Sequence, residues 1–496
     1  MAAARRTHVF DNALDWATPD AFTEDPHHRA GKWLIERGRY GASSDTVVST
    51  GVDREAPELT FAPGLTGWHD VRVRLYHPAR PEGYGVHVGT DKDRALRLLR
   101  PELTSEAFET LSLGPRDMTD AKVRIDASYR NCVLDSVEFA PCDPPKPMRP
   151  AESELCGILD FPCVVDDYRP LEQCAAECVR VHAEAGFTRL FWRAFGVCCE
   201  YPSKIGQTRT PEWDDNRRMC IGRLLEKYDV LRAATEEAHA RNLEILGWMR
   251  INNEFSSPSG HFSATTPFHL AHRDMRQLTR EGRRRPRLSF AYPEVREYLC
   301  GIGREILDRG VDGLLVDALR HPPMVMFDQP LVDGFVRETG QDPRKMCGDG
   351  TEEWLRYRAT AFTSLLADLR AMMDSSGYGN MPIYVRAMPE PWRLLRDGCD
   401  VDAWMRAELV HTIVAESHLH PAHLDLGPLC DLISGRARLM VTVMSCSGVD
   451  AALAMARKAR EQGAVGTAVY ESDFAVTFPS CRDRLRELRW VGSDGG

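Results

Sequence analysis

The chain has 496 residues, of which 43% are hydrophobic and 27% are charged, and its formal net charge is −10 at pH 7. This length exceeds that of one ordinary domain, and the composition excludes a disordered, collagen-like or coiled-coil chain. The negative balance argues against a dedicated nucleic-acid binder. No run of about 18 apolar residues occurs, so we expect neither a membrane span nor a membrane partner.

The first residues include two arginines but no apolar segment after them, so we expect no signal peptide and predict a cytoplasmic location. The fifteen cysteines are then expected to be thiols. Cys174 and Cys178 have helical spacing and Cys198 and Cys199 are adjacent, which is not the paired spacing of a structural zinc site. We therefore expect no metal site and no cofactor.

Short stretches of alternating apolar and polar residues dominate the chain up to about residue 143. Turn residues separate these stretches, which is typical of an antiparallel β-sandwich. The clearest of them are 68–76, 84–88, 121–126 and 132–139. Five prolines follow within residues 141–150 and predict a stiff linker. We expect a sandwich domain over 1–145, a linker over 146–154 and a second domain over 155–496.

The second domain alternates predicted strands with predicted helices, which indicates a parallel sheet. Eight strands over about 340 residues fit a closed (β/α)8 barrel with long loops. The predicted strands are 157–161, 187–194, 243–251, 313–316, 382–387, 409–414, 438–444 and 465–470. The predicted helices are 171–185, 228–242, 293–308, 351–375 and 450–462.

In such a barrel the active site lies at the carboxyl ends of the strands. Here those ends are unusually rich in carboxylates and arginines. The candidates, in chain order, are Asp160, Arg193, Arg250, Asn252, Asn253, Glu254, Asp317, Arg320, Arg386, Glu390, Glu416, Ser445, Glu471 and Asp473. Hydrolysis of a glycosidic bond needs one carboxyl group to protonate the leaving oxygen and another to attack or to activate water.

Residues 310–323, Gly-Val-Asp-Gly-Leu-Leu-Val-Asp-Ala-Leu-Arg-His-Pro-Pro, are the most informative stretch. Asp317 follows a buried run at the point where the strand ends, with Arg320 three residues later. A carboxylate in this position suits a nucleophile or a group that stabilises positive charge. The alternative is that Asp317 caps the following helix or pairs with Arg320.

The combination FAYPEVREYL, from residue 290, and GVDGLLVDALRHP, from residue 310, resembles the glycosyl hydrolase-like family 10 type of (β/α)8 proteins. These are distant relatives of the α-amylase and α-galactosidase barrels. The resemblance covers most of residues 155–475, and residues 328–344 and 398–414 extend it. The N-terminal region resembles a jelly-roll domain attached to some members. This chain departs from the pattern at His411, where a typical member has Asp.

The resemblance implies that Asp317 is the nucleophile. It leaves three choices for the acid/base group: Glu390, at the amylase-like position, Glu416, at the α-galactosidase-like position, and Glu254. A catalytic acid would need its pKa raised toward neutrality.

Other strand-end residues are expected to hold the substrate. These are Asp160, Arg193, Arg250, Asn252, Arg320, His321, Arg386, Trp192, Trp248 and Glu471. Each arginine could simply neutralise a carboxylate; together they could bind an acidic sugar.

Trp192, Trp248, Trp392 and Trp404 could stack on sugar rings or belong to the core. The basic run 283–287 is interpreted as a solvated loop rather than a nucleic-acid site.

We therefore expect a glycosidase acting on a small oligosaccharide or glycoside, with a carbohydrate as its partner and no nucleic acid or membrane. Two alternatives stay open. One is a carbohydrate-binding protein on a degenerate barrel without catalysis. The other is a metal-assisted enzyme in which His418, His420 and a carboxylate are ligands. Homo-oligomerisation also stays open.

Overall fold

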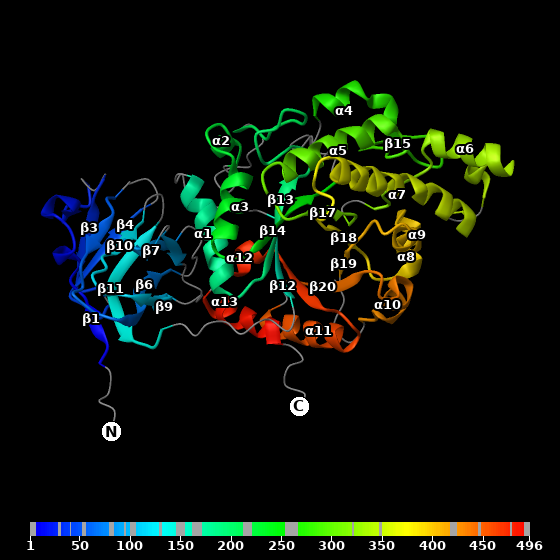
Figure 1. Ribbon diagram of the computed structural model, residues 1–496. Helices are drawn as coiled ribbons and strands as arrows, with labels where there is room; N and C mark the ends of the chain where they lie inside the picture. Colours follow the sequence, from blue (N-terminus) through cyan, green and yellow to red (C-terminus); the bar gives the residue numbers. More distant parts are fainter. Residues whose placement is uncertain are drawn as a thin grey trace.

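The computed structural model describes residues 6–27, 31–39, 41–51, 56–78, 84–93, 96–99, 106–127, 131–144, 154–160, 171–211, 221–252, 266–319, 322–346, 350–416, 424–444, 448–476 and 479–490. Three apolar clusters lie within these residues, one in the N-terminal region and two in the C-terminal region. Figure 1 shows the two parts side by side, with the N-terminal sheets next to helix α1 (Leu171–Glu184). No helix in the described part of the chain is long and apolar enough to cross a membrane.

The N-terminal part is a sandwich of two sheets that share one core. All strand pairs but one are antiparallel. The larger sheet has the order β2 (Phe22–Thr23), β3 (Trp33–Arg37), β4 (Thr46–Thr50), β11 (Cys132–Pro141), β6 (Trp68–His77), β9 (Ala107–Asp117), and β1 (His8–Phe10) pairs with β11. The smaller sheet has the order β5 (Leu59–Phe61), β10 (Val123–Asp126), β7 (Val86–Thr90), β8 (Arg97–Leu99).

The C-terminal part is a closed barrel of eight parallel strands, so the predicted fold is confirmed. Its strands, in order around the barrel, are β12 (Glu154–Leu159), β13 (Arg189–Phe195), β14 (Glu244–Met249), β17 (Leu314–Asp317), β18 (Ile383–Ala387), β19 (Thr412–Ala415), β20 (Arg438–Met444) and β21 (Gly466–Tyr470). The longer helices between them are α1, α3 (Val230–Ala240), α5 (Pro293–Leu307), α6 (Gln329–Thr339), α7 (Glu352–Ser375) and α11 (Val449–Glu461).

The prediction that residues 283–287 form a loop is wrong. Most of this run forms strand β16 (Arg284–Leu288), which pairs antiparallel with β15 (Arg276–Leu278). The hairpin is an insertion between β14 and α5, so a loop was expected where the chain makes an additional small sheet. The proline and the charges hid the strand, because both are depleted in strands. The expected linker lies almost wholly outside the described residues.

The barrel contains two apolar layers, because successive side chains on a strand point to opposite faces. One set, which includes Phe191, Leu246 and Leu315, fills the barrel interior. The other set packs between the strands and the surrounding helices. This alternation decides which strand-end residues face the interior.

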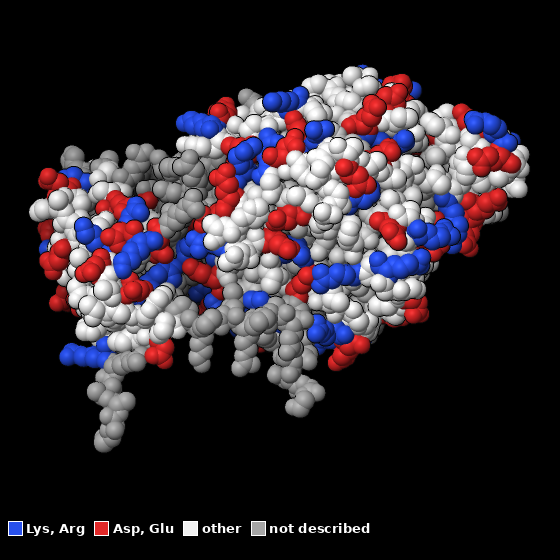
Figure 2. Space-filling model, in the orientation of Figure 1, with Lys and Arg blue, Asp and Glu red and all other residues white. Residues whose placement is uncertain are grey.

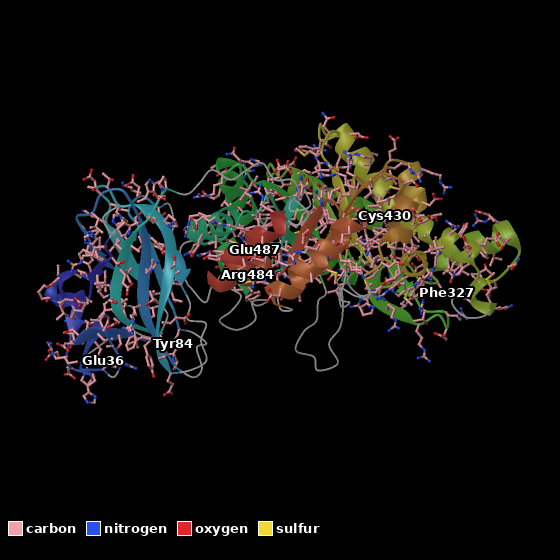
Figure 3. The ribbon with its side chains drawn as sticks, turned by 90° about the horizontal axis from the view of Figure 1, so that it is seen from below. Glu36, Tyr84, Phe327, Cys430, Arg484 and Glu487 are labelled. Atoms are coloured by element: carbon pink, nitrogen blue, oxygen red, sulfur yellow. The ribbon has the colours of Figure 1, made fainter. Side chains whose placement is uncertain are left out.

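An ion network connects the sandwich to the barrel. Arg116 on β9 lies 3.1 Å from Asp93 and 3.4 Å from Glu184, the last residue of α1. Arg180, on the same helix, lies 2.8 Å from Glu184. In Figure 3, Glu36 and Tyr84 lie in the sandwich at one end of the molecule, and Phe327 lies toward the other end. On the face drawn in Figure 2, acidic and basic side chains are interspersed.

His182 connects helix α1 to the segment that follows β21, the last strand of the barrel. Its Nδ1 lies 2.7 Å from the carbonyl oxygen of Cys178, and its Nε2 lies 2.9 Å from Oγ of Ser472, on helix α12 (Ser472–Ala475). The ring is fully buried, and burial lowers the pKa of His182 to about 4. The folded barrel therefore holds a neutral imidazole that the unfolded chain would protonate below about pH 6.5.

We predict that this histidine makes the barrel less stable as the pH falls from about 6.5 to 4. In that window the unfolded state binds a proton that the folded state rejects, at a cost of up to about 3 kcal/mol. Urea unfolding followed by tryptophan fluorescence at pH 7.5 and pH 4.5 measures this loss. The His182→Gln variant should lose about 2 kcal/mol less over the same interval. Equal losses in the two proteins would contradict the prediction.

Candidate active site

Charged side chains form a layer inside the barrel at the carboxyl ends of its strands. Because Leu315 points into the interior, Asp317 two residues later also points inward. The same alternation directs Asp160, Arg193, Arg386 and Tyr470 inward at the ends of their strands. The structure thus brings several of the predicted site residues together.

Asp317 is fully buried and held by three donors. The backbone N–H of Leu319 donates to its Oδ1 at 2.8 Å. The indole Nε1 of Trp248 and Nη1 of Arg386 donate to its Oδ2 at 3.0 and 3.3 Å. Three hydrogen bonds from different parts of the chain fix the orientation of the carboxylate. The expected partner Arg320 lies outside the described residues, and Arg386 takes that role.

Arg386 also binds Glu416, which is fully buried after the neighbouring strand β19. Its Nε and Nη2 donate to Oε2 of Glu416 at 2.9 and 2.5 Å. One guanidinium therefore bridges the two carboxylates. Burial alone lowers the pKa of Arg386, but Glu416 and Asp317 outweigh it and raise that pKa above its ordinary value.

A second group of charges surrounds Asp160, at the end of the first strand. Arg193 and Arg250 donate to its two oxygens at 2.8 and 2.7 Å. The hydroxyl of Tyr470 donates to Oδ2 at 2.6 Å. Arg193 also binds Glu200 at 2.5 Å, and Arg209 lies 3.5 Å from the same carboxylate.

Aromatic rings join the two groups. Arg250 lies over the ring of Trp248 at 4.7 Å, and the indole N–H of Trp248 binds Asp317. Arg386 lies over the ring of Tyr470 at 4.6 Å. A contact path therefore runs from Asp160 through Arg250 and Trp248 to Asp317. Trp248 acts here as a positioning residue within the core rather than as an exposed platform for a sugar.

The remaining predicted residues lie in different places. Glu390 precedes helix α8 (Pro391–Asp397) on the loop after β18 and is half-buried; its Oε2 has no hydrogen-bond partner in the described structure. Asn252 is buried, and its Nδ2 lies 3.7 Å from Sδ of Met324. Glu471 directly follows β21 in a left-handed backbone conformation. The described structure gives no contact between Glu390 and Asp317.

Trp192 does not face the site. It is fully buried and belongs to the layer between strands and helices. Trp192 lies one residue before Arg193, and neighbouring residues on a strand point to opposite faces. Its side chain therefore points toward the helices and not into the site, and the prediction of a position at the rim is wrong. Trp404 is also in this layer, whereas Trp392 on α8 is 65% exposed.

Several candidates lie outside the described residues: Asn253, Glu254, Arg320, His321, Ser445 and the proposed ligands His418 and His420. Among the residues that are described, no group of three or more His, Cys, Asp and Glu is arranged to hold a metal ion. His411 is exposed and accepts a hydrogen bond from the backbone of Ile383, at the start of β18. The departure from the family pattern therefore lies at the amino end of the strands, away from the charged layer.

Sequence reasoning missed three members of the layer: Tyr470, Glu200 and Arg209. Tyr470 was counted as part of an apolar strand, although its position two residues after Ala468 puts it on the inner face. Glu200 lies in the segment after β13, where its backbone N–H binds Ala194. An isolated bridge between Cys199 and Thr208 folds that segment back toward the barrel, which no local pattern indicates.

We predict that Arg386→Met destabilises the barrel by about 3–5 kcal/mol, because it leaves two buried carboxylates without their shared cation. Urea unfolding measures the change. The double variant Arg386→Met/Glu416→Gln removes one of those charges, so it should be more stable than Arg386→Met alone. A double variant that is no more stable would show that Glu416 and Arg386 do not depend on each other.

Comparison with known proteins agrees with the motifs. Residues 198–418 match the model of the family described as Glycosyl hydrolase-like 10. No curated protein matches the chain. The glycoside hydrolase domain of PgaB (BpsB) from Bordetella bronchiseptica is 14% identical, with a TM-score of 0.49 over 68% of this chain and 98% of that one. The catalytic domain of β-amylase from Paenibacillus polymyxa is 8% identical, with a TM-score of 0.45 over 69% and 98%.

The match to the family model spans β17, β18 and β19 and so includes Asp317, Arg386 and Glu416. The resemblance inferred from the sequence motifs is confirmed: over residues 198–418 the chain is similar to the glycosyl hydrolase-like 10 family, and this stretch lies within the closed barrel of eight parallel strands.

Proposed function

We propose that the protein hydrolyses a glycosidic bond in a small glycoside or oligosaccharide, and that the carboxylate of Asp317 acts on the anomeric carbon. The observation that carries this proposal is the set of three donors that holds Asp317 at the carboxyl end of β17. A carboxylate fixed in this way is ready to stabilise an oxocarbenium-like transition state without reorganisation.

The second carboxylate must deliver a proton. Both hydrogen bonds from Arg386 go to Oε2 of Glu416, so that oxygen is engaged within the protein rather than directed at a leaving group. Glu390 has no such cation contact in the described structure, and one of its oxygens is buried. We therefore propose Glu390 as the acid/base and Glu416 as the group that holds Arg386 in place, with Glu254 as the remaining alternative.

The pairing of the arginines indicates whether the sugar beside Asp317 is acidic or neutral. Arg193 and Arg250 both bind Asp160, and Arg386 binds Asp317 and Glu416. Each of these three is thus engaged by a carboxylate of the protein, and the fourth arginine behind the acidic-sugar hypothesis, Arg320, lies outside the described residues. We propose a neutral sugar there.

A carbohydrate-binding protein without catalysis is the second candidate. It is favoured by the complete burial of Asp317 and Glu416 and by the ion pair that each makes. The metal-assisted alternative depends on His418 and His420 and stays a prediction. Metal analysis of the purified protein separates it from the other two.

We predict that wild type turns over at least one member of an aryl-glycoside panel. Asp317→Asn should lower kcat by about a thousandfold or more, because it removes the charge that stabilises the transition state. The variant's melting temperature controls for folding. Glycan binding that is the same in both proteins, without turnover by either, would favour the carbohydrate-binding alternative.

We further predict that the rate lost in Glu390→Gln depends on the leaving group of the substrate, whereas the rate lost in Glu416→Gln does not. A good leaving group such as 2,4-dinitrophenol needs no protonation, so loss of the acid should slow its glycosides far less than those of poor leaving groups. Glu390→Gln should show this selectivity, and Glu416→Gln should slow both kinds equally. The reverse pattern would make Glu416 the acid.

A further inference from the structure

The segment 273–287, called the arginine hairpin below, contains seven arginines and two carboxylates in a chain whose net charge is −10. It comprises β15, β16 and the residues around them. Two of its arginines serve the fold. Arg280 donates to the carbonyl oxygen of Met346 and lies over the ring of Phe327, and Arg287 lies 3.5 Å from the carbonyl oxygen of Pro323.

The other five arginines make no hydrogen bond or ion pair through their side chains with the described residues. They are Arg273, Arg276, Arg283, Arg284 and Arg285. All but Arg276 are exposed, and Nε of Arg276 is buried without a hydrogen-bond partner in the described structure. The two acids of the segment offset them only in part: Glu281 accepts from Thr279 and is attracted by Arg283, and Asp274 is exposed.

The arginine hairpin lies on the same side of the barrel as the candidate active site. It follows β14, so it belongs to the face where the strands end at their carboxyl side. It also packs on the loop that follows Asp317. The side-chain amide of Gln277 donates to the carbonyl oxygen of Met324 at 2.7 Å, and the backbone N–H of Phe327 donates to the carbonyl oxygen of Leu278 at 3.0 Å. Asn252, from the candidate site, contacts the side chain of that same Met324.

Asp328 connects both sides of the hairpin to the start of helix α6. It is fully buried, accepts from the backbone of Leu278 at 3.0 Å and accepts from Ser289 at 2.6 Å, on either side of the hairpin. Figures 1 and 3 both show this part of the barrel, marked by β15 and by Phe327, away from the sandwich. The sandwich therefore leaves the arginine hairpin uncovered.

We propose that the arginine hairpin binds carboxylate or sulfate groups on the glycan chain beyond the bond that is cleaved, so that the substrate is an acidic oligosaccharide with a neutral sugar beside Asp317. This proposal rests on the proposed function. Guanidinium groups bind such oxyanions in a bidentate manner. A short acidic chain would meet only the hairpin, whereas a long nucleic acid would also meet the negative remainder of the protein, which repels it.

Calorimetry with the Asp317→Asn variant tests the proposal, because that variant does not consume the ligand. The probes are a hexasaccharide in which glucuronate alternates with neutral N-acetylglucosamine, a partly sulfated hexasaccharide and neutral maltohexaose. We expect at least one acidic probe to bind more tightly than maltohexaose. Arg283→Gln/Arg284→Gln/Arg285→Gln, made in the same background, should weaken that binding by about tenfold. Added salt should weaken it as well.

The matched control is Arg232→Gln/Arg304→Gln/Arg457→Gln, which removes three exposed arginines from barrel helices and changes the net charge equally. It should change the affinity by less than about twofold. Equal weakening in the two triple variants overturns the proposal, as does failure of both acidic probes to bind. Tighter binding of a hexanucleotide, or of vesicles with anionic lipid, overturns it in favour of that partner.

The same measurements separate this proposal from the function on which it rests. Hairpin-dependent binding of an acidic probe, with no turnover of any glycoside by the wild type, rejects hydrolysis and leaves an acidic glycan as the ligand. Turnover of aryl glycosides, with neither acidic probe bound, supports hydrolysis and rejects the acidic substrate.

Discussion

Arg386 is the group on which the candidate site depends. It lies between Asp317 and Glu416, and both carboxylates are fully buried. Removing a carboxylate from water is costly unless a cation or hydrogen-bond donors replace the water, and here one guanidinium serves both carboxylates. A barrel interior offers such a cation only from a neighbouring strand, and Arg386 stands on β18, between the strands that carry the two acids. The position of this one guanidinium therefore decides whether Asp317 and Glu416 can both be buried here.

The rest of the layer repeats this solution. Asp160 is satisfied by Arg193, Arg250 and Tyr470, and Arg250 in turn lies over Trp248. Such a network adds little net stability, since desolvation offsets most of the attraction between its charges. What it provides is orientation: each carboxylate is held by donors from different strands, and those strands belong to one closed sheet. Fixed dipoles and charges of this kind are what electrostatic stabilisation of a transition state requires.

The sequence allowed the barrel to be predicted strand by strand, because each strand is a short apolar run between helices whose ends carry Gly or capping residues. It also allowed Asp160, Asp317 and Arg386 to be placed in the site, since a charged residue at the end of a buried strand has few other positions. Trp192 was misplaced because the inward or outward direction depends on a single-residue register. Glu200 could not be found, because the fold-back of its segment rests on a long-range bridge. The pairing of the arginines could not be found either, since it depends on which strands are neighbours.

Burial explains why arginines at this end of the molecule fall into two classes. Inside the barrel a guanidinium has no water to solvate it, so Arg193, Arg250 and Arg386 each meet a carboxylate of the protein. On the arginine hairpin that constraint is absent: water solvates Arg283, Arg284 and Arg285, and nothing requires the chain to supply a counter-charge there. The arginines inside the barrel are therefore paired with carboxylates of the protein. The exposed arginines of the hairpin have no such pairing in the described structure and can bind an anion from solution. This division is the reason why we place recognition of substrate charge at the hairpin rather than in the layer beside Asp317.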